Sequence, residues 1–321
     1  MRGRVPTPKA LAKWDRASVA IFARSAFGVR CVLASLYCLS STVIMHAEAN
    51  TYSHRWFDFF HVNISEARTM QEAAFVCRCA PLPGFRKIAD VCCGMGRHAR
   101  AFSKHGYSVI GLDRDADVIA KARALAGGPT YLNADVRDYR PDPGMFDVTI
   151  MMSQSFGYFD ARTNRQVLGR LADGVREGGQ VILDLWNAEF FMIHQGRYQF
   201  KTPAGVVRET RHVDEDRLFV HLDYPDGGED NFEWQLFTPA RMISMAESVG
   251  LRQLLACTAF DETTPPSPTN PRAQFVLERC RTWRIHNVCG VQREPLQKEH
   301  ENFALGSRSL FYCSAFAFRS R

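Results

Sequence analysis

The sequence lacks three features that would each define a class of protein. No stretch approaches the roughly 20 consecutive apolar residues of a membrane-spanning helix, because the apolar run within residues 31–45 is diluted by Ser40, Ser41 and Thr42. The ten cysteines include no paired Cys-x-x-Cys motifs of the kind that binds zinc. We therefore expect no membrane span and no metal site, and we expect the thiols to be reduced.

A strong charge of one sign is also missing from the middle of the chain. The net charge of the 321 residues is +6, but residues 1–30 hold seven basic residues against one acidic residue, and residues 281–321 hold seven against three. The part between them is therefore slightly acidic. A nucleic-acid groove needs a basic face beside the site, so we expect a small molecule rather than a nucleic acid as the partner.

The two ends of the chain carry the least information. Residues 1–49 form an N-terminal extension of doubtful order, in which a basic lead and an apolar run precede Ala47-Glu48-Ala49, a sequence that looks like a signal cleavage site. The basic lead is about twice as long as that of a secretory signal, so we favour a cytoplasmic protein with a start site near Met45, and export through residues 1–49 is the alternative. Residues 283–321 show no clear period and are assigned no function.

A pattern that suits a nucleoside cofactor lies between residues 88 and 136. An apolar strand at 88–91 leads into Cys92-Cys93-Gly94-Met95-Gly96, and a helical pattern and a second strand ending on Asp113 follow. Glycine lets the backbone turn tightly and approach a ligand, and a helix that begins near Gly96 directs free N–H groups at an anion. An acidic residue at the tip of the next strand commonly binds a ribose diol.

Strands and helices alternate through the rest of this region. The alternation predicts an α/β fold, a doubly wound parallel sheet with helices on both faces, and ligands of such sheets lie at the carboxyl ends of the strands. The further elements that we expect are strands at 130–134, 146–152 and 181–185, and helices at 116–126 and 163–176, the second ended by Gly178-Gly179.

The glycine turn satisfies two different motifs. Gly94-x-Gly96-x-x-Ala99 matches the weak fingerprint of dinucleotide-binding proteins. Asp90, four residues before the first glycine, and the Cys-Cys pair instead resemble motif I of class I S-adenosylmethionine-dependent methyltransferases in its Asp-Val-Cys-Cys-Gly form. The resemblance continues through the strand-four and strand-five motifs and covers roughly residues 50–280. An NAD-binding dehydrogenase-like protein or a non-catalytic adenosyl-binding protein is the less favoured alternative.

This resemblance implies a Rossmann-like seven-stranded sheet and S-adenosylmethionine as the cofactor. It implies that Asp90 holds the turn and the methionine amino group, that Asp113 binds the ribose hydroxyls, and that Asp135 and Val136 recognise the adenine. The cofactor-binding residues that we expect are Asp90, Cys92, Gly94, Gly96, Arg97, Asp113, Arg114, Asp135, Val136 and Ser153.

The acceptor is harder to predict than the cofactor. Methyl transfer is an in-line displacement for which an enzyme mainly supplies proximity and alignment, so no catalytic base can be named. Weak candidates for catalysis are Ser153, Tyr158 and His98, and His98 is more readily explained as packing the glycine turn. The Asn/Asp-Pro-Pro-Tyr motif of amino-group nucleic-acid methylation is absent after strand four. We expect an O or N atom of a small molecule as the acceptor, with an RNA or protein methyltransferase as the alternative.

The domain organisation follows from where the alternation stops. We expect a cofactor-binding core at 50–187, a β-rich insertion at 188–236 that the resemblance implies to be a lid, and strands within 237–282 that complete the core sheet. An aromatic helix at 52–60 is expected to pack onto this sheet, with Tyr52 or Trp56 at the border of the methyl-donor pocket as the alternative. The oligomeric state is not predicted.

Overall fold

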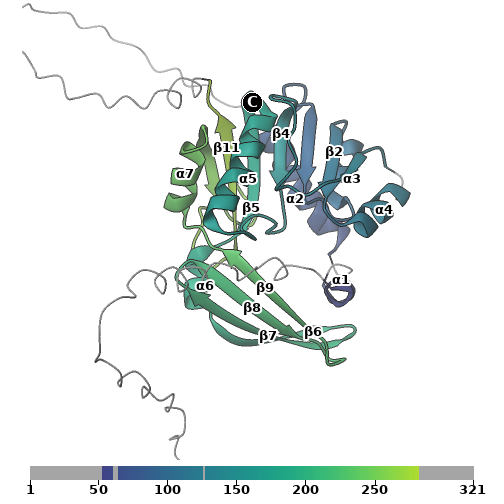
Figure 1. The fold of residues 1–321 in the computed structure, drawn as a ribbon, viewed down its shortest axis with the longest axis vertical. Helices are drawn as coiled ribbons and strands as arrows, with labels where there is room; N and C mark the ends of the chain where they lie inside the picture. The colour runs from purple at the N-terminus through teal and green to yellow at the C-terminus, as the bar shows by residue number, and fades with distance from the viewer. Residues whose placement is uncertain (1–52, 61–63, 126, 282–321) are drawn as a thin grey trace, which may run out of the picture.

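The computed structural model describes residues 53–60, 64–125 and 127–281, and the predictions for 1–49, 283–321 and Tyr52 lie outside them. A seven-stranded sheet lies between two layers of helices, and a second, four-stranded sheet lies beyond the carboxyl ends of its parallel strands (Figure 1). No helix of the described residues is both long and apolar enough to cross a membrane.

The seven-stranded sheet has the order β10-β11-β5-β4-β1-β2-β3. Its strands are β1 (Lys87–Val91), β2 (Ser108–Asp113), β3 (Thr130–Asn133), β4 (Phe146–Met151), β5 (Val175–Trp186), β10 (Leu251–Cys257) and β11 (Arg272–Arg279). The first five run parallel, whereas β11 is antiparallel to both β5 and β10. The strand order reverses between β1 and β4, which is where ligands bind in such sheets. The predicted Rossmann-like fold is confirmed.

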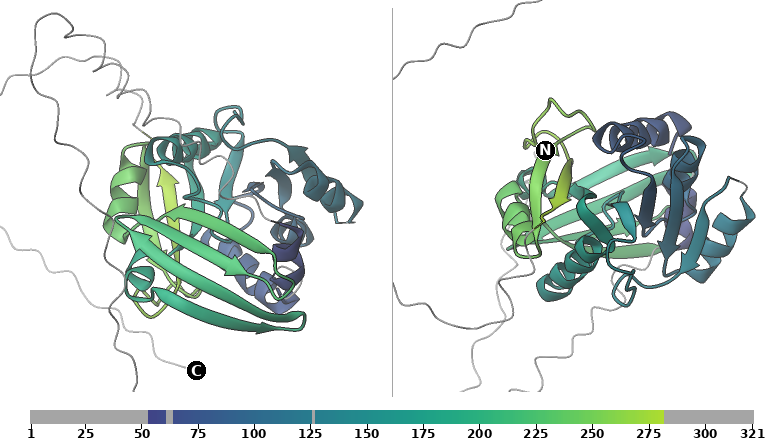
Figure 2. Two further views of the ribbon diagram at one scale, coloured as in Figure 1. Left: turned by 60° about the horizontal axis from the view of Figure 1, so that its bottom comes forward. Right: turned by 90° about the horizontal axis from the view of Figure 1, so that it is seen from above.

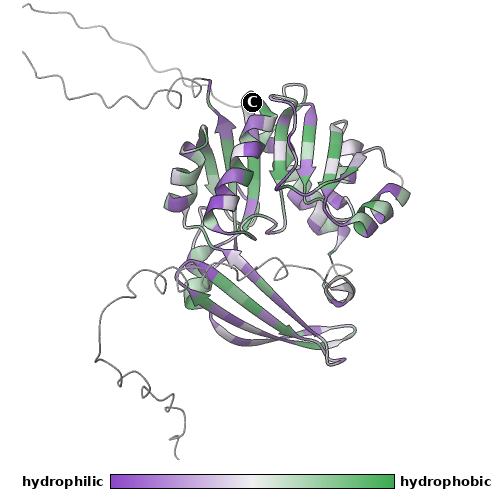
Figure 3. Ribbon diagram, viewed as in Figure 1, coloured by the Kyte–Doolittle hydropathy of each residue, from purple (hydrophilic) through white to green (hydrophobic). Residues whose placement is uncertain are grey.

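Helices cover both faces of this sheet (Figure 2). One face carries α2 (Glu66–Cys79), α3 (Arg97–Lys104) and α4 (Ala116–Ala124), and the other carries α5 (Ala161–Gly174) and α7 (Pro239–Glu247). Because both faces are covered, the central strands β1 and β4 are buried along most of their length. Hydrophobic bands recur along the strands of this sheet in the hydropathy colouring (Figure 3). Two hydrophobic cores result, one on each side of the sheet.

The prediction of a helix reaching Arg176 was wrong. The helix α5 ends at Gly174, and Val175 already pairs with Phe146 as the first residue of β5. The register of this pairing then shifts, and Gly178, with φ +71°, lies within the irregular part of the strand. A pair of glycines here marks a bulged strand rather than a helix end.

The four-stranded sheet forms the predicted β-rich insertion after strand five. Its strands are β6 (Gly196–Thr202), β7 (Gly205–Asp214), β8 (Arg217–Asp223) and β9 (Glu229–Gln235), all antiparallel and in chain order. All four strands lie within the expected segment, and the short helix α6 (Ala188–Ile193) that precedes them was not predicted. This sheet has its own hydrophobic core, which includes Phe191 from α6.

The N-terminal helix α1 (His54–Phe59) packs against the four-stranded sheet and not, as predicted, against the seven-stranded one. The Phe59 ring lies 5.1 Å from that of Tyr224. The Ser53 hydroxyl donates a hydrogen bond of 2.6 Å to Asp230, and Arg55 forms an ion pair with Asp226. These contacts attach α1 to the loop and strand that follow β8, so α1 and this sheet form one layer over the carboxyl edge of the core.

Candidate functional site

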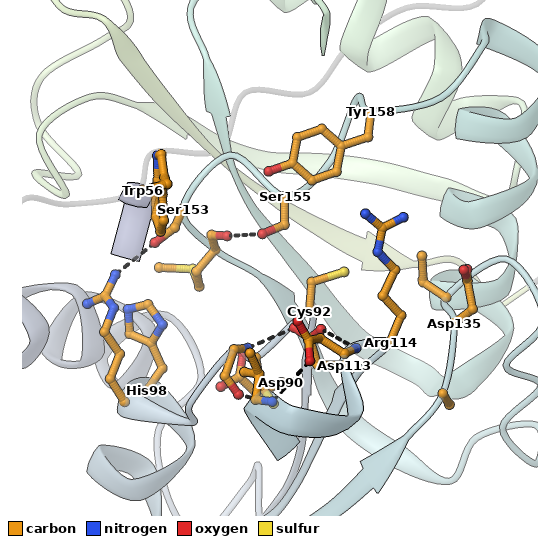
Figure 4. A pocket seen from close by; sticks show the side chains of 18 of the residues that line it. Trp56, Asp90, Cys92, His98, Asp113, Arg114, Asp135, Ser153, Ser155 and Tyr158 are labelled. Carbon is orange, nitrogen blue, oxygen red and sulfur yellow. Dashed lines mark hydrogen bonds between the residues drawn. The ribbon is translucent and has the colours of Figure 1, made fainter. Parts of the chain in front are cut away.

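A cavity opens at the carboxyl ends of β1, β2 and β4, between the core and the layer formed by α1 and the second sheet (Figure 4). It encloses about 1230 Å³, its open mouth included. Nine of the ten predicted cofactor-binding residues line it, namely Asp90, Cys92, Gly94, Arg97, Asp113, Arg114, Asp135, Val136 and Ser153. The weak catalytic candidates His98 and Tyr158 also line it. Segments that lie up to about 60 residues apart along the chain therefore share one cavity, as expected for strands that end at the same edge.

The two glycines of the turn serve different purposes. Gly94 has φ +53°, and a Cβ added to it would meet nothing within 4 Å, so its bare face points into open space in the cavity. Gly96, with φ +72°, is the N-cap of α3, and a Cβ there would clash with the Tyr131 ring. Gly96 does not line the cavity. The missing side chain at Gly96 thus makes room for the Tyr131 ring beneath the turn, and its role as a cofactor contact stays a prediction.

Cys92 occupies a backbone conformation that usually belongs to glycine. It has φ +58° and lines the cavity directly after β1. Left-handed backbone costs a residue with a Cβ about 1–2 kcal/mol, and such strain concentrates at functional sites. Burial raises the pKa of the Cys92 thiol well above its usual value, so the thiol is neutral at physiological pH.

Two carboxylates hold the turn from opposite sides. Asp113, at the end of β2, accepts hydrogen bonds from the backbone N–H of Gly94 at 2.9 Å and of Asp115 at 3.1 Å. Asp90 is buried and accepts one from the backbone N–H of Ala99 at 3.0 Å. Burial raises the pKa of Asp90 to about 7, although the charge of Arg97 opposes this shift. A cationic group bound in the cavity would therefore favour the charged form of Asp90.

Asp135 lies at the far end of the cavity from Arg97. It accepts hydrogen bonds from the guanidinium and the backbone N–H of Arg137, two residues further on, which lower the pKa of Asp135. Arg137 itself stacks on the Phe159 ring with 5.2 Å from guanidinium carbon to ring centroid. Val136, the next residue, is buried beside it. This end offers a charged acceptor next to apolar surface, which suits a flat nitrogen heterocycle.

His98 is buried, and its surroundings do not favour a role as a catalytic base. Its Nε2 lies 2.8 Å from a carboxylate oxygen of Glu72. Desolvation lowers the pKa of His98 to about 4 despite this hydrogen bond, so the imidazole is neutral at physiological pH. The Phe102 ring stacks beside it. This environment supports the packing interpretation of His98 over the catalytic one.

Ser153 is held in a strained loop directly after β4. Ser153 and Gln154 have φ values of 55° and 60°. The Ser153 hydroxyl accepts a hydrogen bond of 2.7 Å from Arg97 (Figure 4), and its backbone N–H donates one of 2.8 Å to Asp184. Two consecutive left-handed residues without glycine persist only where the surroundings fix them, and Asp184 provides part of that support.

The other side of the cavity is aromatic. Trp56 from α1 and Tyr158 and Phe159 from the loop after β4 line it. Trp234 of β9 packs against Tyr158 with 5.6 Å between ring centroids, and its indole N–H donates to the Gln154 carbonyl at 3.0 Å. Trp56 at this border agrees with the alternative that the sequence left open for the aromatic helix, and Trp234 was not predicted.

Three buried charged residues were also missed by sequence reasoning. They are Glu72 on α2, Asp184 on β5 and Arg272 on β11. Glu72 contacts Arg97, Asp184 contacts Ser153, and Arg272 contacts Glu72. None of the three lines the cavity. Asp184 ends the strand-five motif and interrupts an apolar strand, which is a pattern that could have drawn attention to it. Nothing in the sequence near Glu72 or Arg272 marks either residue.

Comparison with protein families identifies residues 88–179 as matching the family described as "Methyltransferase domain". A glycine/sarcosine N-methyltransferase of Parasynechococcus marenigrum (strain WH8102) is 25% identical over 55% of this chain and 66% of the relative. A glycine/sarcosine/dimethylglycine N-methyltransferase of Actinopolyspora halophila is 22% identical over 68% of this chain and 40% of the relative. The chain spans less than two thirds of the length of these curated relatives.

Solved structures show the same fold at low sequence identity. The CcbJ methyltransferase from Streptomyces caelestis has a TM-score of 0.60 at 16% identity, covering 70% of this chain and 96% of that one. CalS10, an amino pentose methyltransferase from Micromonospora echinaspora solved with S-adenosylmethionine bound, has a TM-score of 0.54 at 16% identity, covering 72% and 98%. Both comparisons agree with the predicted class I fold.

Proposed function

We propose that the protein, whose residues 88–179 match a methyltransferase-domain family, takes a methyl group from S-adenosylmethionine and transfers it to a nitrogen atom of a small molecule. The observation that carries the proposal is the convergence of Asp90, Gly94, Asp113, Asp135 and Ser153, from the ends of different strands, on one cavity. A dinucleotide enzyme would share the glycine turn, but the buried acid before that turn suits the cationic methionine end of S-adenosylmethionine.

The lining residues fit this cofactor along its whole length. Asp90, whose pKa burial raises to about 7, would meet the positively charged methionine amino group, and Arg97 would meet the carboxylate. Gly94 presents backbone without a side chain to the cavity. Asp113 would hold the ribose hydroxyls, and Asp135 with Val136 would hold the adenine. Cys92, Arg114 and Ser153 complete the proposed contacts.

The cofactor, when bound, supplies an electrophilic methyl group on a sulfonium. The residues of this chain would then orient the acceptor for an in-line attack and exclude water from it. Ser153 and Tyr158 have hydroxyls at the cavity and would position the acceptor, while Trp56 and Phe159 would cover it. We assign no catalytic base, since the neutral His98 is hydrogen-bonded to Glu72 and lies beneath the turn.

A nitrogen atom and a small acceptor are supported by separate observations. The curated relatives are named as N-methyltransferases of glycine and its methylated forms. Trp56, Tyr158 and Phe159 line one side of the cavity, and such an aromatic side suits a small acceptor. An RNA substrate is disfavoured because the net charge of the chain between residues 31 and 280 is negative.

The first test is a thermal-shift titration of the full chain with S-adenosylhomocysteine and, separately, with NADH. A ligand that binds only the native state stabilises it by about 2.7 kcal/mol at a hundredfold excess over its dissociation constant. We expect a shift with the adenosyl ligand alone. Transfer of labelled methyl groups to glycine, sarcosine and a panel of amino sugars would then identify the acceptor. A shift with NADH alone would contradict the proposal.

A further inference from the structure

A closed ring of hydrogen bonds runs beneath the methionine end of the proposed cofactor site. Arg272 donates to Asp184, Asp184 accepts from the Ser153 backbone N–H, the Ser153 hydroxyl accepts from Arg97, and Arg97 donates to Glu72. Glu72 closes the ring by accepting from Arg272 at 3.1 Å. Each of these five residues thus contacts two others, and they come from α2, α3, β5, β11 and the loop after β4.

The charges within this ring balance one another. It contains two arginines and two carboxylates, and both carboxylates are fully buried. The guanidinium of Arg272 bridges them, with one edge on Asp184, where Nε lies 2.9 Å from Oδ1, and its remaining nitrogen on Glu72. Burial lowers the pKa of Arg272 to about 10, so it stays charged at physiological pH. Removing Arg272 would leave the buried Asp184 without its cationic partner.

The ring divides into residues that touch the cavity and residues that do not. Arg97 and Ser153 line the cavity, whereas Glu72, Asp184 and Arg272 lie behind them. The bridge from Arg272 therefore determines where two cavity side chains sit without entering the cavity itself. Asp184 also accepts the Gln154 backbone N–H through its own carbonyl at 3.0 Å, so it holds both left-handed residues of the strained loop.

We propose that Arg272, with Glu72 and Asp184, is a positioning residue that fixes Arg97 and Ser153 for binding of S-adenosylmethionine and alignment of its methyl group. This inference rests on the proposed function. A planar guanidinium can serve two carboxylates at once in a fixed geometry, whereas the ammonium of a lysine cannot. Small displacements of positioned groups can lower turnover by about a hundredfold, so the geometry of this bridge matters more than its charge.

The test uses Arg272→Lys, which keeps the charge, in the full chain. S-adenosylhomocysteine binding is measured by calorimetry well below the melting temperature, and the conservative control is Arg252→Lys, where Arg252 forms an exposed pair with Glu278 on β10 and β11. We expect Arg272→Lys to raise the dissociation constant about tenfold, since contacts that act through positioned groups respond to sub-ångström shifts. The control variant should bind as the wild type does.

A double-mutant cycle with Ser153→Ala separates positioning from a general loss of stability. Ser153→Ala opens the ring, so Arg272→Lys in that background should cost much less affinity than it does alone. When Arg252→Lys is combined with Ser153→Ala, the two effects on affinity should simply add. If Arg272→Lys does not fold, Glu72→Gln, which keeps the side-chain shape, undergoes the same cycle. With an acceptor in hand, the ring variants should also lower kcat.

The outcomes separate this inference from the proposed function. Coupling between Arg272→Lys and Ser153→Ala supports positioning. A wild type that binds S-adenosylhomocysteine, together with ring variants whose affinity is unchanged or whose effects simply add, overturns the positioning role and leaves the proposed function intact. A wild type that does not bind S-adenosylhomocysteine overturns both. If the wild type binds S-adenosylhomocysteine but methylates no acceptor of the panel, the double-mutant cycle on its dissociation constant still tests the ring in full.

Discussion

The two sheets of this protein differ in how they are stabilised and in what they contribute to the cavity. The strands of the seven-stranded sheet are buried on both faces and end in the residues of the cofactor side. The four-stranded sheet is buried on one face only, where its core includes Leu218 and Trp234, and its other face carries polar residues such as His221 and Asn231. We infer that the first sheet holds the residues of the cofactor side in place, and that the second sheet shapes the space above them.

This difference predicts separable effects of substitution. Changes at the carboxyl edge of the first sheet should alter folding or cofactor binding, whereas changes at the contact between the second sheet and the loop after β4 should alter the acceptor side.

The largest effect is expected from Gly96→Ala. The new Cβ would meet the Tyr131 ring in a backbone conformation that already costs a residue with a side chain about 1–2 kcal/mol, and overpacking adds about 1–3 kcal/mol. Chemical denaturation should show a loss of about 2–5 kcal/mol in the free energy of unfolding. The matched control is Gly94→Ala, whose Cβ enters open space. It should unfold more nearly like the wild type but bind S-adenosylhomocysteine poorly, and equal stability losses would contradict this difference.

Asp113→Ala should affect binding more than folding. The substitution removes the proposed ribose contacts and the acceptor for the Gly94 N–H, which we expect to weaken S-adenosylhomocysteine binding by about 1–3 kcal/mol. Calorimetry measures this directly, and a melting curve of the free protein serves as the control for folding. Unchanged affinity in a folded variant would show that Asp113 does not contact the ribose.

The raised pKa of Asp90 predicts that stability and cofactor affinity change in opposite directions as the pH rises. Its pKa is raised from 3.8 to about 7 in the folded protein, so the folded state binds more protons than the unfolded state within this window. The contribution of Asp90 to the stability of the free protein should therefore fall as the pH rises from about 4 to 7. Affinity for S-adenosylhomocysteine should rise toward pH 7, by at most about tenfold per pH unit, because the ammonium group favours the ionised carboxylate.

The Asp90→Asn variant provides the control for this prediction. It cannot ionise, so calorimetric titrations between pH 5 and 8 should give an affinity that changes much less with pH than that of the wild type. A pH dependence equal to that of the wild type would assign the effect to another group.

The sequence could predict the cofactor side because its determinants are local. The glycine turn, Asp90 and Asp113 lie within one strand–helix–strand unit, and parallel strands bring their carboxyl ends together by geometry alone. The order of the core elements was predicted correctly for the same reason. The helix end near Gly178 was not, because a bulged pairing with β4 decided the outcome there.

The acceptor side, and the charged residues behind the cofactor side, could not be predicted because tertiary contacts form them. Trp234 reaches the Gln154 carbonyl from 80 positions along the chain, and Arg272 reaches Glu72 from 200. The helix α1 packs on the second sheet through Ser53 and Phe59, which its aromatic periodicity could not distinguish from packing on the first. Periodicity identifies which face of a helix is buried, but not the surface that buries it.

The smallest effect, and the sharpest test of the division, is expected from Trp234→Phe. The substitution keeps an aromatic ring beside Tyr158 but removes the indole N–H that donates to the Gln154 carbonyl at 3.0 Å. Loss of one such hydrogen bond should destabilise the loop after β4 by about 0.5–1.5 kcal/mol. Because Tyr158 of this loop is proposed to position the acceptor, KM for the acceptor should rise several-fold, and the affinity for S-adenosylhomocysteine should fall, through Ser153, by much less than it does in Asp113→Ala. Val207→Ala, a change in the same core but on β7, is the control. If Trp234→Phe instead weakened cofactor binding as much as Asp113→Ala does, the two sheets would act on a single site without division, and the second sheet would belong to the cofactor side.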